Sequence, residues 1–194
     1  GAFGLVYNDR IGFVQKAFSD GSVKSERGNV GNAFIYGIES LIDFNLNKIF
    51  IKDNDFSFNY FTNISVIDSK YTSSQVNGVE GNKVEFVPNL NFKTGIKFGY
   101  KNLLSNIQYT YLSEQFTDAT NAIEGNLSGV IGQIPAYEVL DISLSYTYKQ
   151  FKLETGVNNL TNNYYFTRRA TGYPGPGIIP SPDRNFYMTL EIKF

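Results

Sequence analysis

The last ten residues of the chain, 185–194 (NFYMTLEIKF), alternate between apolar and polar side chains. One side of an extended chain would carry Phe186, Met188, Leu190, Ile192 and Phe194. The opposite side would carry Tyr187, Thr189, Glu191 and Lys193. Because successive side chains of a β-strand point to opposite faces, this period of two predicts a strand with one apolar face and one polar face.

The same period returns in earlier segments, most clearly in 56–66, 90–100 and 139–148. Together with the turn residues between them, these patterns predict about eight strands, which are 2–15, 28–46, 55–71, 87–100, 103–117, 136–149, 151–166 and 184–194. Such strands exceed the roughly 5–6 residues that are usual in globular sheets. They reach the ~9–11 residues that a membrane-crossing strand needs.

The connections between these strands alternate in length. Tight, polar links are predicted at 45–54, 100–103 and 148–151. Long links rich in Gly, Ser, Asn, Asp and Pro are predicted at 16–27, 72–86, 118–135 and 167–183. Short turns on one side and long loops on the other are typical of outer-membrane β-barrels.

Two all-β folds can use strands with one apolar face. A soluble β-sandwich would bury that face against a second sheet, whereas a membrane barrel would turn it toward lipid. The chain has 14 Tyr and 17 Phe although it is only 42% hydrophobic, and Tyr is frequent near the predicted strand ends. This distribution favours the aromatic girdles of a barrel. We therefore expect an antiparallel transmembrane β-barrel fold in contact with outer-membrane lipid.

The composition argues against several other classes of protein. The chain lacks Cys and His and has a net charge of −1. A thiolate nucleophile, a His-dependent catalytic triad and a His-ligated metal are therefore excluded, and we expect neither enzyme activity nor a cofactor. A near-neutral chain also offers no basic face for nucleic acid.

Several segments resemble the C-terminal part of TonB-dependent outer-membrane receptors, with ferric dicitrate (iron-siderophore) receptors as the nearest subgroup. They are GVNNLTNNYYFTRR at 156–169, NVGNAFIYGIES at 29–40, YLSEQFTDA at 111–119 and the approach to a strand at 132–141. The resemblance implies a bacterial outer-membrane barrel of about 22 strands with a plugged lumen. Residues 1–194 would supply its last eight or so strands, whereas the plug and its TonB-contacting segment have no counterpart here.

The resemblance also implies a function. An iron chelate would bind at the outer loops and pass inward with energy from the TonB complex, acting through the missing N-terminal part. The alternative is a passive porin-like or adhesin-type barrel that works without energy coupling. A plug upstream of this chain would favour uptake.

Basic and aromatic residues at the last long loop are the best candidates for contact with such a ligand. Guanidinium groups suit carboxylate-rich chelates, so we expect Arg168, Arg169 and Tyr173 to bind ligand at the extracellular rim. The alternatives are a solvated loop pair or bridges to lipopolysaccharide phosphates. Arg10, Lys16 and Arg27 flank another outer loop, but their spacing defines no constellation.

The resemblance assigns a second role to the terminal strand. The apolar series of Phe186, Met188, Leu190, Ile192 and Phe194 would be the signal that the barrel-assembly machinery reads, and unpaired backbone at such an edge suits strand addition. The simpler interpretation is a lipid-facing strand, and both can hold. For 157–161 (VNNLT) we expect a local turn closed by Asn and Thr side chains rather than a contact with the plug.

Overall fold

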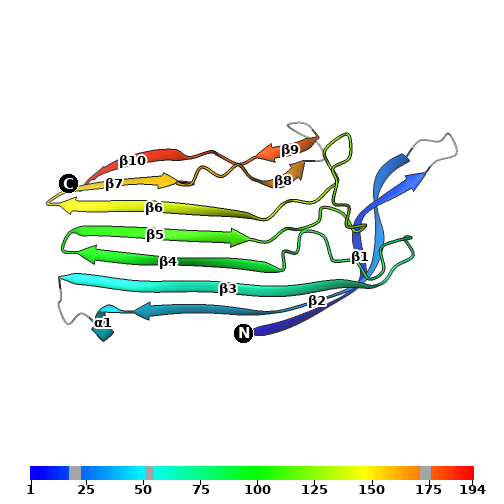
Figure 1. Cartoon of the computed structure of the whole chain (residues 1–194), viewed down its shortest axis with the longest axis horizontal. Coiled ribbons are helices and arrows are strands. Elements are labelled where there is room, and N and C mark those ends of the chain that lie inside the picture. The colour runs from blue at the N-terminus through cyan, green and yellow to red at the C-terminus, as the bar shows by residue number, and fades with distance from the viewer. Residues whose placement is uncertain (18–22, 51–54, 171–175) are drawn as a thin grey trace.

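The computed structural model describes residues 1–17, 23–50, 55–170 and 176–194. Eight strands form one antiparallel sheet in the order β1-β2-β3-β4-β5-β6-β7-β10, and the short strands β8 and β9 form a separate hairpin. The sheet stays open, with β1 and β10 at its two edges (Figure 1). The expected all-β antiparallel fold is thus confirmed as an eight-stranded part of a barrel wall.

The elements of the large sheet are long. They are β1 (Ala2–Ala17), β2 (Val23–Asn45), β3 (Phe56–Ser73), β4 (Leu90–Tyr100), β5 (Leu103–Leu112), β6 (Tyr137–Tyr148), β7 (Phe151–Asn158) and β10 (Asn185–Ile192). The hairpin consists of β8 (Phe166–Ala170) and β9 (Gly177–Pro180). A four-residue helix, α1 (Asn47–Phe50), follows β2. Among the described residues, no helix has the length and apolar character needed to cross a membrane.

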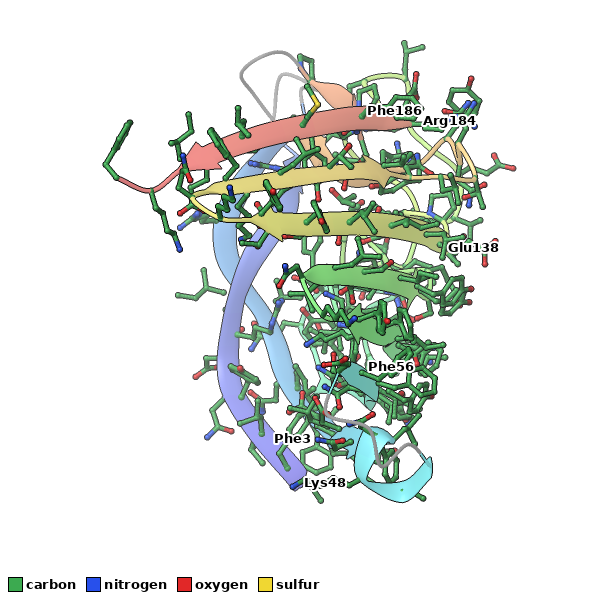
Figure 2. All side chains as sticks on the ribbon, turned by 90° about the vertical axis from the view of Figure 1, so that its left-hand side faces the viewer. Phe3, Lys48, Phe56, Glu138, Arg184 and Phe186 are labelled. Atoms are coloured by element: carbon green, nitrogen blue, oxygen red, sulfur yellow. The ribbon has the colours of Figure 1, made fainter. Side chains whose placement is uncertain are left out.

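The register assigns a chemically distinct character to each face of the sheet. Phe186 pairs with Val157, Val157 with Ile142, and Ile142 with Ile107, so the apolar residues of neighbouring strands lie on one face. We call this the outer face, and Phe186 and Met188 on it are 75% and 76% exposed. The opposite, inner face carries mainly polar residues and glycines. Figure 2 shows side chains projecting from both faces.

Aromatic rings cover glycines on the inner face. A Cβ added to Gly95 would lie 2.6 Å from the ring of Phe61 and 2.5 Å from the backbone oxygen of Ile107. At Gly156, an added Cβ would meet the ring of Tyr187 at 2.6 Å. Phe61 pairs with Gly95 and Tyr187 with Gly156 across adjacent strands. These glycines are needed because a paired aromatic side chain occupies the space above the backbone.

The structure corrects some expected boundaries. The strand expected over 151–166 ends at Asn158, because Asn159 adopts a left-handed conformation with φ of 52° and starts a turn. The strand expected over 103–117 ends at Leu112. The β8–β9 hairpin and helix α1 were not expected, since both lie in segments whose residue types indicate loops.

Candidate functional site at the loop end of the sheet

The long connections gather at one end of the sheet, opposite the short turns (Figure 1). There the 74–89 connection packs on the inner face, where Val79 and Val84 are each 1% exposed. They join a buried cluster that contains Val30, Ala33 and Ile35 of β2, Tyr71 of β3, and Ala119. The connection is therefore anchored by its own apolar side chains and does not extend freely outward.

A buried polar cluster fixes the same connection to two strands. Glu85 forms an ion pair with Arg10 of β1, and their side chains are only 9% and 22% exposed. The hydroxyl of Tyr71 donates to Glu85 Oε2 at 2.7 Å and accepts from Arg10 Nη1 at 2.8 Å. Each of the three side chains thus has two partners in the cluster. These contacts offset the cost of taking the charged groups out of water, because a buried charge without a partner is strongly destabilising.

Tyr71 lies near the loop end of strand β3, which has 18 residues. A strand needs only ~9–11 residues to cross a membrane, so Tyr71 lies in the part of β3 that extends past such a crossing. Burial, together with its hydrogen bond to Glu85, raises the pKa of the Tyr71 hydroxyl well above its ordinary value. Tyr71 therefore remains a neutral donor under physiological conditions.

The 74–89 connection is bound in turn to the 113–136 connection. The backbone N–H of Phe86 donates to the carbonyl of Phe116 at 2.9 Å. Asn82 Nδ2 donates to the carbonyl of Ala119 at 2.9 Å. Asn121 accepts from the N–H of Lys83 at 2.8 Å and donates to its carbonyl at 2.9 Å. These bonds couple two connections that are separated by the hairpin of β4 and β5.

Arg169, one of the expected ligand contacts, links the 113–136 connection to the β8–β9 hairpin. Its Nη1 donates to the carbonyl of Gly129 at 2.9 Å, and its Nη2 donates to that of Gln133 at 3.0 Å. The guanidinium also lies 5.1 Å from the ring centroid of Phe166. Through these contacts Arg169 holds the β8–β9 hairpin against the 113–136 connection.

The other two expected ligand contacts have different positions. Arg168 is exposed in the adjacent position on β8. Tyr173 lies outside the described residues. Of the flanking tyrosines, Tyr164 is 82% exposed, whereas Tyr165 stacks on Tyr137 with ring centroids 4.7 Å apart. The structure therefore separates Arg168, which faces solvent, from its bonded neighbour Arg169.

The turn expected at 157–161 is present and centres on Asn159, which is 2% exposed. Its Oδ1 accepts from the N–H of Asn163 at 2.9 Å, and its Nδ2 donates to the carbonyl of Asn163 at 2.9 Å. Its own N–H donates to Asp141 Oδ1 at 2.9 Å. An Asn side chain that closes the turn accounts for this part of the motif.

The inner face near the short turns contains a hollow of about 370 Å³, lined by polar residues together with apolar ones such as Leu104. Its lining includes Ser57, Asn106 and Ser143, with Lys97 and Glu154 at its sides. Asn106 Oδ1 is buried there without a hydrogen-bond partner.

The terminal strand β10 pairs with β7 from Asn185 to Ile192. Its outer-face residues Phe186, Met188, Leu190 and Ile192 range from 43% to 76% exposed, and Phe194 is fully exposed. This arrangement is that of an edge strand with an exposed apolar face. Its role as an assembly signal stays a prediction.

The ion pair between Arg10 and Glu85 was not expected from the sequence. Arg10 stood out only as a basic residue beside a long loop. The available signal was Glu85 itself, a carboxylate between Val84 and Phe86 in a connection of mostly polar residues. Within the described part of the chain, no group of three or more His, Cys, Asp or Glu side chains gathers to hold a metal ion.

The open sheet with an apolar outer face, a polar inner face and loops at one end defines part of a membrane β-barrel. The sequence matches the family described as TonB dependent receptor-like, beta-barrel, over residues 1–160. The chain belongs to this family. None of the curated proteins searched matches the sequence significantly.

Solved structures share the fold over most or all of the chain. The ferric citrate transporter FecA, in its unliganded form, has a TM-score of 0.79 at 20% identity, covering 100% of this chain and 28% of FecA. The copper transporter OprC has a TM-score of 0.71 at 17% identity, with coverage of 100% and 28%. The ferric yersiniabactin uptake receptor FyuA from Yersinia pestis has a TM-score of 0.67 at 19% identity, with coverage of 87% and 25%. The chain thus spans about a quarter of the length of each of these proteins.

Proposed function

We propose that the chain is the C-terminal barrel portion of a bacterial outer-membrane receptor that takes up an iron chelate with energy from the TonB complex. A plug within the lumen, supplied by a preceding segment, would couple that energy to transport. Ferric dicitrate or a siderophore-like chelate is the proposed ligand class. Family membership and the similarity to transporters of ferric chelates support this proposal.

The observation that carries the proposal is the inward-folded 74–89 connection. It packs on the inner face through Val79 and Val84 and binds the 113–136 connection. Connections that fold over a lumen narrow its mouth, and a narrowed mouth suits a receptor that captures one ligand. A passive pore requires a lumen that stays open to solutes.

Uptake by the full-length receptor tests this proposal. Cells that depend on the receptor should accumulate labelled iron from ferric dicitrate or a siderophore, and the accumulation should cease when TonB is deleted. Copper supplied as a free salt serves as the competing substrate, because OprC shares the fold and is a copper transporter.

The outcomes separate the candidate functions. Iron accumulation that persists without TonB would favour the passive porin-like barrel. TonB-dependent accumulation of copper but not of iron would retain energy coupling and overturn the iron-chelate assignment.

A further inference from the structure

Two lysines of β4, Lys93 and Lys97, lie on the inner face of the sheet. Gly95 between them is covered on that face by the ring of Phe61, and side chains two residues apart along a strand share a face. The two lysines are four residues apart, which is about 13 Å of antiparallel strand. Because β4 leads from the loop end to the short turn before β5 (Figure 1), Lys93 lies nearer the loops and Lys97 nearer the short turns.

Both lysines are surrounded by neutral side chains. Their partners on the neighbouring strands are uncharged, namely Asn63 and Thr110 for Lys93, and Asn59 and Asn106 for Lys97. The ammonium group of Lys97 lies 5.2 Å from the ring centroid of Phe61. Both lysines are exposed, and within the described part of the chain neither forms an ion pair. Their charges are therefore available to a molecule that enters the lumen.

Two lysines nearer the C-terminus, by contrast, have carboxylate partners. Lys152 Nζ lies 2.5 Å from Glu154 Oε1, and Lys193 Nζ lies 3.6 Å from Glu191 Oε1. The positive charge of β7 and β10 is thus balanced locally, whereas that of β4 is not. A concave surface that carries unbalanced charge of one sign attracts ions of the opposite sign. The inner face at β4 therefore attracts anions.

Lys97 also borders the 370 Å³ hollow near the short turns. This volume falls within the roughly 300–1,000 Å³ of sites that bind small molecules. The unpartnered Oδ1 of Asn106 lies in the lining, and a buried acceptor of this kind is normally satisfied by water or by a bound molecule. Glu154 borders the hollow as well, but its charge is balanced by Lys152. The hollow thus offers an anion one ammonium group among neutral polar side chains.

We propose that Lys93 and Lys97 guide an anionic ferric chelate along the wall of the lumen, from the loop end toward the short turns. We call the two residues the lysine guide. A chelate whose carboxylates outnumber the charges of ferric iron is an anion. Lys93 attracts it from the mouth, and Lys97 holds it in the hollow before release. Exposed cations in series suit passage, because each site must bind firmly enough to attract the ion and weakly enough to let it leave.

The inference rests on the proposed function, and uptake of labelled ferric dicitrate by cells that carry the full-length receptor tests it. In the double variant Lys93→Gln with Lys97→Gln, the maximal rate of uptake should fall about tenfold, the scale of one lost charge-assisted contact. Binding of ferric dicitrate to cells that lack TonB should keep its affinity, because the outer loops make the first contact. The double variant Lys93→Arg with Lys97→Arg keeps both charges and should transport normally.

The matched control is the double variant Lys70→Gln with Lys149→Gln, which removes the same amount of positive charge from other parts of the wall. Lys70 is exposed and pairs with Phe34, whose side of the sheet is the outer face. Lys149 lies in the turn between β6 and β7. This control should take up ferric dicitrate at the rate of the unmodified receptor. Equal slowing of uptake in the control would overturn the lysine guide.

Three other outcomes would also overturn it. Normal uptake in the glutamine variant of the guide, alongside TonB-dependent uptake by the unmodified receptor, would refute the guide and leave the proposed function intact. Weaker binding to cells without TonB would place the lysines in the first contact site instead. Faster amide hydrogen exchange in the plug of the ligand-free variant would show that the lysines hold the plug. Absence of uptake by the unmodified receptor would overturn the proposed function and the guide together.

Discussion

The guanidinium of Arg10 and the carboxylate of Glu85 form an ion pair across 75 residues of sequence. One partner belongs to a strand of the sheet, and the other belongs to a connection folded on its inner face. Tyr71 bonds to both partners. This pair, together with the apolar cluster beneath it, determines how far the 74–89 connection can move from the wall.

Replacing Glu85 with Ala should therefore release this connection. Removal of one partner from a buried pair leaves an uncompensated charge, at a cost of about 3–5 kcal/mol when burial is complete. Because the Arg10 side chain is still 22% exposed, we expect the variant to lose less, about 2 kcal/mol of the stability that holds the connection on the sheet. Amide hydrogen exchange across 76–87 of the full-length receptor measures it. Asp55→Ala is the control, since its pair with Lys101 is exposed and exposed pairs contribute about 0–1 kcal/mol. Equal protection in both variants would contradict the prediction.

The Tyr71→Phe variant removes one hydroxyl and keeps the ring. We expect the free energy of unfolding to fall by about 1–2 kcal/mol, because the variant lacks the buried hydroxyl that donates to the Glu85 carboxylate. The raised pKa of Tyr71 means that the folded protein keeps a proton that the unfolded chain releases. This contribution is complete below about pH 10 and is lost as the pH rises further. Unfolding measured against pH should show the two proteins converging at alkaline pH, and a constant difference would refute the assignment.

The two neighbouring arginines of β8 should behave differently. Arg169→Ala removes two bonds to backbone carbonyls and should loosen the 113–136 connection by about 1–3 kcal/mol. Proteolytic cleavage within that connection reports the change. Arg168→Ala should leave cleavage unaltered, because Arg168 is exposed, and should weaken chelate binding if this residue contacts ligand. Normal chelate affinity in Arg168→Ala would remove Arg168 from the ligand site.

Glycines of the sheet should differ in their tolerance of a methyl group. In Gly95→Ala, the added Cβ would meet the backbone of Ile107 and the ring of Phe61, so we expect a loss of about 1–3 kcal/mol from overpacking. In Gly4→Ala, the nearest atom, on the ring of Phe34, is an ordinary 3.6 Å away, which makes this variant the control. Resistance of the folded barrel to heating in detergent compares them. Equal resistance would show that the ring is not confined to its place over Gly95.

Deletion of Phe194 tests the assembly signal. We expect less receptor in the outer membrane, because the last outer-face aromatic of the terminal segment is lost. Phe194→Tyr keeps a ring and should restore most of the level. The amount of folded receptor in isolated outer membranes measures both variants. Full assembly after the deletion would leave this residue a lipid contact only.

Strand content was predictable because each long strand has one mainly apolar face and one mainly polar face. Residues such as Leu144 and Met188 alternate with polar neighbours, and this alternation is visible in the sequence. The ends of strands were less predictable. At Asn159 the backbone bends because its own side chain bonds to Asn163, and the alternation of neighbouring residues carries no trace of that bond.

The candidate site was predictable only in part. Arg168 and Arg169 are adjacent and chemically identical in the sequence, yet one is exposed and the other bonds to Gly129 and Gln133. Which of the two arginines forms these bonds depends on the path of the 113–136 connection, more than 30 residues earlier in the chain. The residues next to the arginines in the sequence give no information about that path. The ion pair between Arg10 and Glu85 could not be predicted for a similar reason. It forms only because the 74–89 connection folds back on the sheet.

The bonds between successive connections bear on how new ligand preferences could arise in such a receptor. A 113–136 segment grafted from a relative would lose the Asn121 side chain, which bonds to the N–H and the carbonyl of Lys83, unless the relative also has Asn there. Its backbone would also have to follow the same path to bring carbonyls to Asn82 and Arg169. Chimeric receptors should fold when segments 74–89, 113–136 and 159–184 are exchanged together. Natural selection would then act on the three segments as one unit.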